Sequence, residues 1–198
     1  MDARVIKNRD VKLLNADDKS ATLAMQNDWT VRDQVLIEES LTSVVREIPG
    51  AYLLDVTYRF SPKDVDVVLP TWSFGGFCVS GRSDAESSYY EGPEGKVDRG
   101  NPSMIDGETS WPDADWYSRT HVLAGKTAGY AVVNHPSNPK TRWWNPPSTG
   151  NINPSIVTYG DCKIPHDQPL TLKYRVVAHD GEMAASRKSE LASEFRRT

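Results

Sequence analysis

The chain of 198 residues has only two cysteines, no long apolar run and no excess of basic residues. Cys78 and Cys162 lie far apart and neither belongs to a Cys-x-x-Cys pair, so we expect reduced thiols rather than a disulfide framework or a zinc knuckle. The net charge is −4, with acidic and basic residues mixed along the whole length. This balance argues against nucleic acid and anionic membranes as partners.

No segment is apolar enough to span a bilayer, and the first residues lack the apolar core of a signal peptide. As written, the sequence predicts a soluble, cytoplasmic protein, and a periplasmic or secreted one if a leader lies upstream. A Gly-x-Ser-x-Gly elbow, a phosphate-binding glycine loop and a Rossmann fingerprint are all missing. Covalent serine catalysis and nucleotide binding are therefore not indicated.

The clearest periodic signal is strict alternation of apolar and polar residues at 51–60 and at 170–179. In the first segment one face carries Tyr52, Leu54, Val56, Tyr58 and Phe60. In the second, one face carries Leu170, Leu172, Tyr174, Val176 and Ala178, and the other carries Thr171, Lys173, Arg175 and His179. This pattern predicts half-buried antiparallel strands, with His179 on the polar face.

Weaker strand patterns are spread over the rest of the chain, and turn residues such as Pro49-Gly50 separate them. They cover residues 21–26, 34–48, 65–69, 74–80, 128–134 and 155–159. Many short strands with this spacing predict an all-β protein, an antiparallel β-sandwich that forms a single domain over residues 1–198.

One helix is expected, at the C-terminus, where Asp180 can cap a segment with Met183, Leu191 and Phe195 at helical spacing. We expect it to pack across an edge of the sheet. The region from Gly81 to Trp116 has little periodicity, and its aromatic residues favour a functional loop over disorder.

The segment Asn134-His-Pro-Ser-Asn-Pro-Lys-Thr-Arg-Trp-Trp-Asn145 concentrates polar and aromatic side chains. Its two prolines predict a loop rather than a helix or strand interior. Loops of this composition often carry function.

Five segments carry distinctive motifs, and together they cover most of the chain from about residue 50 onward. They are Asp55-Val-Thr57, Phe74-Gly-Gly-Phe-Cys-Val79, Trp116-Tyr-Ser118, Gly129-Tyr-Ala-Val-Val-Asn-His-Pro-Ser-Asn-Pro139 and Tyr174-Arg-Val-Val-Ala-His-Asp-Gly181. These segments resemble the bacterial family of unknown function whose members are called PmoA-like or methane-oxygenase-like. The resemblance implies a β-sandwich in the style of sugar mutarotases and polysaccharide lyases, and through that analogy a link to carbohydrates.

The chain also departs from this family. Its members usually carry a histidine-rich segment of the type Asp-His-Pro-His-His-Arg near the N-terminus, and all four histidines here lie after residue 120. Either the chain is a truncated relative or its true start lies upstream.

Three residues are candidates for acid/base chemistry. His135 either acts as a general acid or base, or it binds loop backbone and fixes the proline-rich turn. His179 lies beside His135 if their two strands are neighbours, and such a pair with a carboxylate would suit a divalent metal, although no local ligand spacing supports one. Asp115 is the third candidate, because the neighbouring apolar side chain of Trp116 can raise the pKa of its carboxyl group. No cofactor is predicted.

The candidates for substrate binding are polar and aromatic residues of the same loops. Arg142 and Asn138 can bind sugar hydroxyls, and an indole ring can pack on the face of a pyranose. Adjacent residues of an extended chain point to opposite sides, so either Trp143 or Trp144 lines a site, or both anchor the loop. Trp116 is a further candidate from the aromatic loop.

Three functions are compatible with these observations. The first is a carbohydrate-processing sandwich, of the lyase, epimerase or hydrolase type, that acts on a sugar or oligosaccharide with His135 and His179 as titrating groups. The second is a module that binds such a ligand without catalysis. The third is an assembly role, in which another copy of the chain covers exposed sheet edges to form a homo-oligomer.

Overall fold

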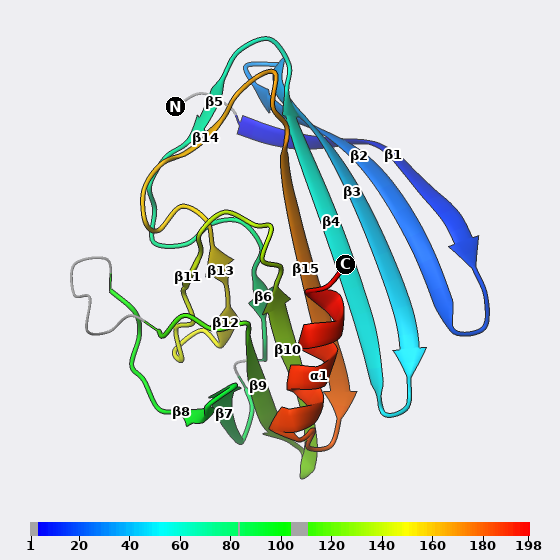
Figure 1. Cartoon of the computed structure of the whole chain (residues 1–198), viewed down its shortest axis with the longest axis vertical. Coiled ribbons are helices and arrows are strands. Elements are labelled where there is room, and N and C mark those ends of the chain that lie inside the picture. Colours follow the sequence, from blue (N-terminus) through cyan, green and yellow to red (C-terminus); the bar gives the residue numbers. More distant parts are fainter. Residues whose placement is uncertain (1–3, 83, 104–110) are drawn as a thin grey trace.

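A large antiparallel sheet dominates the computed structural model, which describes residues 4–82, 84–103 and 111–198 (Figure 1). Nine strands lie in the order β1-β2-β3-β4-β15-β10-β9-β7-β8. In this spatial order they are Arg4–Ala16, Ser20–Val31, Gln34–Ile48, Ala51–Pro62, Leu170–Asp180, Lys126–Asn134, Trp116–Leu123, Ser87–Gly92 and Gly95–Val97. The last long strand, β15, therefore lies in the middle of the sheet between β4 and β10.

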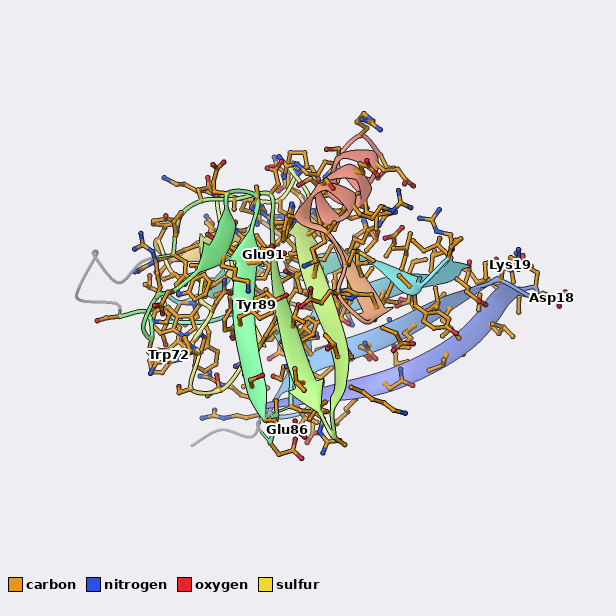
Figure 2. All side chains as sticks on the ribbon, turned by 90° about the horizontal axis from the view of Figure 1, so that it is seen from below. Asp18, Lys19, Trp72, Glu86, Tyr89 and Glu91 are labelled. Atoms are coloured by element: carbon orange, nitrogen blue, oxygen red, sulfur yellow. The ribbon has the colours of Figure 1, made fainter. Side chains whose placement is uncertain are left out.

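Short strand pairs and one helix cover this sheet. The pairs are β5 (Val67–Leu69) with β14 (Cys162–Ile164), β6 (Val79–Ser80) with β12 (Asn151–Ile152), and β11 (Arg142–Trp143) with β13 (Pro154–Ser155). The helix α1 (Ala185–Phe195) lies along β10 and β15 (Figure 1). Figure 2 shows the β1–β2 turn, with Asp18 and Lys19, reaching away from this covered part.

Strand alternation gives the sheet two different faces. On β10, Ala131 and Val133 pack with Leu191 and Phe195 of α1, on what we call the helix face. Their neighbours Tyr130 and Val132 point the other way and pack with Trp143 of the short strands, on what we call the inner face. Each face therefore has its own apolar core.

The predicted fold is confirmed: the protein is mainly antiparallel β, in the manner of a sandwich, with one C-terminal helix. The alternating segments 51–60 and 170–179 are the central strands β4 and β15. The helix face was not anticipated, because both strands bury residues there too, among them Leu53 and Val177. Tyr52, expected to be buried, is exposed.

Three expectations about local structure are wrong. Asp180 does not cap α1, because β15 continues to Asp180 and the helix begins after Ala184 with no side-chain cap. The helix lies on the face of the central strands and not across an edge. The loop after β10 also contains regular structure, since Arg142–Trp143 pairs with Pro154–Ser155.

No helix within the described parts of the chain is long and apolar enough to cross a membrane. Both cysteines are unpaired.

Candidate functional site

His135 lies directly after β10, where its ring fixes the turn that follows. The backbone N–H of Ser137 donates to Nδ1 at 3.1 Å, and the Ser137 hydroxyl lies 2.7 Å from the same atom. The neutral ring then carries its proton on Nε2, which is buried and has no hydrogen-bond partner. Burial lowers the pKa of His135, and the charges of Lys173 and Arg196 lower it further. This geometry matches the turn-fixing alternative.

A pocket of about 240 Å³ beside His135 also contains Asn138 and Asp115. The Asn138 amide is used in full: Oδ1 accepts from Lys173 N–H at 2.8 Å, and Nδ2 donates to the Lys173 carbonyl at 2.8 Å. Asp115 forms an ion pair of 2.9 Å with Arg196, just after α1. The polar groups of this pocket thus hold the loop and the end of the helix in place.

His179 is buried on the helix face, so its expected place on a polar face is wrong. Its Nδ1 lies 3.0 Å from the Gly181 carbonyl, to which it donates. The ring lies against Gly129, where a Cβ atom would come within 2.7 Å of it. Burial is the main cause that lowers the pKa of His179.

His135 and His179 do not converge. Their strands are neighbours, but His135 lies beside Lys173, and Lys173 and His179 are six positions apart on β15. At about 3.3 Å per residue this amounts to roughly 20 Å. The two imidazoles cannot act on one substrate or share a metal ion. Among the residues that the structure describes, no three His, Cys, Asp or Glu side chains are grouped as a metal site.

The tryptophans do not form a common platform. Trp143 and Trp116 are each about 1% exposed and lie on opposite faces of the sheet, with indole N–H bonds to the Ala114 carbonyl and to Ser189 Oγ. Both therefore pack in the two cores. Trp144 is half-buried under the guanidinium of Arg142, which lies 5.9 Å from its ring centre and donates to the Ser103 carbonyl.

A different cleft lies between the inner face and the short strands, and its volume is about 340 Å³. Five aromatic residues line it: Trp29, Tyr58, Phe60, Phe77 and Tyr174. The rings hold one another in place, with Tyr58 stacked on Phe60 and Phe77 stacked on Tyr174. Aliphatic residues of the large sheet (Ile6, Ile37, Leu172), of β5 and β14 (Leu69, Ile164) and of the segment after β13 (Ile156) close the remaining sides.

One carboxylate, that of Glu39, lines this aromatic cleft, and the residue is only 5% exposed. Oε1 accepts a hydrogen bond of 2.8 Å from Asn27 Nδ2, and Oε2 accepts one of 2.7 Å from Trp29 Nε1. Both donors are neutral, and no Lys, Arg or His in the described parts of the chain lies within 4 Å as a salt-bridge partner. A buried charge with neutral neighbours alone is costly, and each oxygen keeps a lone pair for a ligand.

Two tyrosine hydroxyls share this environment. Tyr174 is fully buried, and its hydroxyl has no hydrogen-bond partner. Burial raises the pKa of Tyr174, and burial together with the charge of Glu39 raises the pKa of Tyr58. Both therefore stay protonated near neutral pH and can donate to a ligand oxygen.

Sequence reasoning missed this cleft. The usable signal was Glu39 itself, which occupies an inward position of β3 between Ile37 and Leu41, where the alternation calls for an apolar residue.

Comparison with known proteins gives a family but no activity. None of the curated proteins searched matches the chain. The model of one family, described as a family of unknown function (DUF6807), matches residues 3–193. The match includes β1 to β3, so the N-terminal strands are as much part of the family as the motif-bearing segments. The chain therefore belongs to the DUF6807 family of unknown function.

Proposed function

We propose that this protein binds a carbohydrate-class small molecule in the aromatic cleft of the inner face, with Glu39 as the recognition group. The observation that carries the proposal is a buried carboxylate with neutral partners only, set among five aromatic residues around about 340 Å³. Such a volume lies within the range of small-molecule sites.

A sugar matches this set of groups better than a purely apolar ligand. Its C–H faces pack on aromatic rings, while its hydroxyls can donate to the lone pairs of Glu39 and accept from Tyr58 and Tyr174. An apolar ligand would leave the carboxylate and the Tyr174 hydroxyl unsatisfied. The resemblance to PmoA-like proteins supports the same ligand class by analogy.

We propose binding without hydrolysis. Glycoside hydrolysis normally needs two carboxyl groups on either side of the bond, and Glu39 is the one acidic residue among those that line the cleft in the described structure. The acid/base pair expected of His135 and His179 is not part of this proposal, because their rings lie too far apart.

The experiment is a titration of the protein with neutral mono- and disaccharides, followed by calorimetry and by the fluorescence of Trp29, with Trp29→Phe to assign the signal. Glu39→Gln should weaken binding about tenfold or more, because a hydrogen bond to a charged group is lost. The matched control is Glu38→Gln, since Glu38 is exposed and next in sequence.

The proposal fails if no saccharide binds, or if Glu39→Gln binds as tightly as the parent. Aromatic rings with a carboxylate would also suit an organic cation. Tetramethylammonium is therefore titrated in parallel, and its binding in place of any sugar would contradict the carbohydrate class.

Assembly is the second candidate, and one observation favours it. The outer edge of β1 has no paired strand in the described structure, and the strand exposes several large apolar side chains: Val5, Ile6, Val11, Leu13 and Leu14. Lys7 and Lys12 on the same strand oppose edge-to-edge pairing. A monodisperse monomer in light scattering would remove this candidate.

A further inference from the structure

Arg119, on the inner face of β9, is a buried cation with no counter-ion among the residues that the structure describes. The residue is 6% exposed, and Nη2 donates to Ser88 Oγ at 2.9 Å. The other two nitrogens, Nε and Nη1, are buried and have no hydrogen-bond partner within residues 4–82, 84–103 and 111–198. In the parts of the chain that the structure describes, no carboxylate lies within 4 Å of the guanidinium as a salt-bridge partner.

Two other buried cations of the protein are treated differently. Arg175 forms a two-bond pair with Asp55, at 2.5 and 2.8 Å, and also donates to the Leu191 carbonyl. Lys188 donates to Glu91 at 2.7 Å and to Ser118 at 3.1 Å. Both are about 1% exposed and fully partnered. The guanidinium of Arg119, with no carboxylate partner among the described residues, thus differs from both of these cations.

Two further polar groups lie next to Arg119. His121, two residues along the same strand, points to the same face, is 6% exposed, and has no partner for Nδ1. Ser88 is the partner of His121 in the β7–β9 ladder and is exposed. The three side chains therefore form a triangle that reaches solvent at Ser88.

Two glycines bring loop backbone close to this triangle. A Cβ atom on Gly150 would lie 1.2 Å from Arg119 Nη1, and one on Gly81 would lie 2.6 Å from His121 Cε1. The Gly81 N–H donates to the Gly150 carbonyl at 3.2 Å, and so does the Tyr130 hydroxyl at 2.7 Å. The absence of side chains at both positions lets loop backbone border the guanidinium and the imidazole on one side. Aromatic rings border them on another, with the Tyr90 ring centre 5.4 Å from the guanidinium and the Tyr130 ring centre 5.6 Å from that of His121.

We propose that Arg119, His121 and Ser88 form a binding site for a small oxyanion group, either a carboxylate or a phosphate. The free Nε–H of Arg119 can donate a charge-assisted hydrogen bond to such a group, while His121 and the Ser88 hydroxyl supply further hydrogen bonds. The site is separate from the aromatic cleft, because β9 and β3 are four strands apart in the sheet.

The test measures thermal unfolding of the full chain with increasing phosphate or acetate, against sodium chloride at the same ionic strength. An anion that binds only the folded protein raises its midpoint. We expect one of the two anions to raise it in the parent, and the effective anion identifies the group. In Arg119→Met the anion-dependent rise should vanish, with affinity at least tenfold weaker. The midpoint in chloride alone should be higher than in the parent, since an unpaired buried charge is removed.

Two more variants make the result specific. Ser88→Ala alters an exposed side chain and should weaken anion binding several-fold without loss of folding. Arg82→Met is the control, because Arg82 is exposed, directly follows Gly81 and pairs with Asp84; it should leave the anion effect unchanged. The proposal is wrong if neither anion exceeds chloride, or if the rise persists in Arg119→Met. Should that variant not fold, an undiminished rise in Ser88→Ala contradicts it equally.

Discussion

The two faces of the large sheet handle buried charge in opposite ways. On the helix face, Arg175 is paired with Asp55 and Lys188 with Glu91, and each cation has further hydrogen bonds. On the inner face, Glu39 has two neutral donors and Arg119 has a single serine. In Figure 2, Glu91 is seen on β7, the strand that also carries Ser88.

This difference separates stability from binding. A buried ion pair contributes little net stability but is very costly to break, so the helix face holds α1 against the sheet in one arrangement. Buried charges without a counter-ion are costly in the free protein, and a ligand that supplies the missing partner recovers that cost. The inner face is therefore where ligands are expected, and the predictions below test this contrast.

Asp55→Asn should have the largest effect. It removes the two-bond partner of the buried Arg175, which is left with only the exposed Glu194 at 3.9 Å, and Arg46 also loses its partner at 2.8 Å. The free energy of unfolding should fall by about 3–5 kcal/mol in urea titrations. The control is Glu194→Gln, because Glu194 is exposed and lies 3.9 Å from Arg175. A loss no larger than that of the control would mean that this pair does not hold the helix face together.

Gly129→Ala should destabilise the same face by about 1–3 kcal/mol through overpacking. The new methyl group would lie 2.7 Å from the His179 ring and 3.1 Å from the Arg119 carbonyl oxygen. Gly100→Ala is the matched control, since nothing lies within 4 Å of a Cβ atom there. Equal thermal midpoints for the two variants would show that the His179 ring can move aside.

Glu39→Gln makes the same acid-to-amide change on the inner face, and here we expect a change in unfolding free energy below about 1 kcal/mol without ligand. The loss of one acceptor is offset by removal of an unpaired buried charge. Urea titrations of this variant and of Asp55→Asn compare the faces directly. If the free energy of unfolding falls as much as in Asp55→Asn, the two faces do not differ in this respect and Glu39 has a structural role.

Lowering the pH should change the stability of the protein less than Asp55→Asn or Gly129→Ala does. The pKa values of His121, His135 and His179 are all lowered, with burial as the largest cause. Because each folded-state pKa lies below the unfolded value of about 6.5, their contribution to stability is complete above that pH and is lost as the pH falls below it.

The opposite sign applies to His166, whose pKa Asp66 raises, but this exposed pair contributes little. Thermal midpoints measured between pH 7.5 and 5 test the summed effect of these histidines on stability. In His179→Gln we expect the midpoint to depend less on pH. A midpoint that rises on acidification would contradict the assignment.

The central strands were predictable because each carries a continuous apolar face. The helix face was not, since Arg175 and His179 look solvent-exposed in the sequence, and only the packing of α1 and their local hydrogen bonds make them buried residues. The two- and three-residue strands β6 and β11 to β14 are too short for any periodic signal. Strand β1 was missed because its exposed residues do not alternate.

The candidate site shows the same limit. The loop after β10 attracted attention through its composition, yet Asn138 and His135 have local hydrogen bonds that account for them. Glu39 and Arg119 give no motif, because what distinguishes them is a missing partner. A missing partner depends on which strands are neighbours, and sequence patterns do not predict that.

Asn138 has one more consequence. Its side-chain amide meets the N–H and the carbonyl of Lys173 as a peptide group of a neighbouring strand would. The register between the loop and β15 is therefore held by this side chain together with one backbone hydrogen bond, from the His135 N–H to the Lys173 carbonyl at 3.4 Å. Insertions or deletions after Pro139 could change the length of the loop over evolution without shifting the sheet, provided that the asparagine is kept.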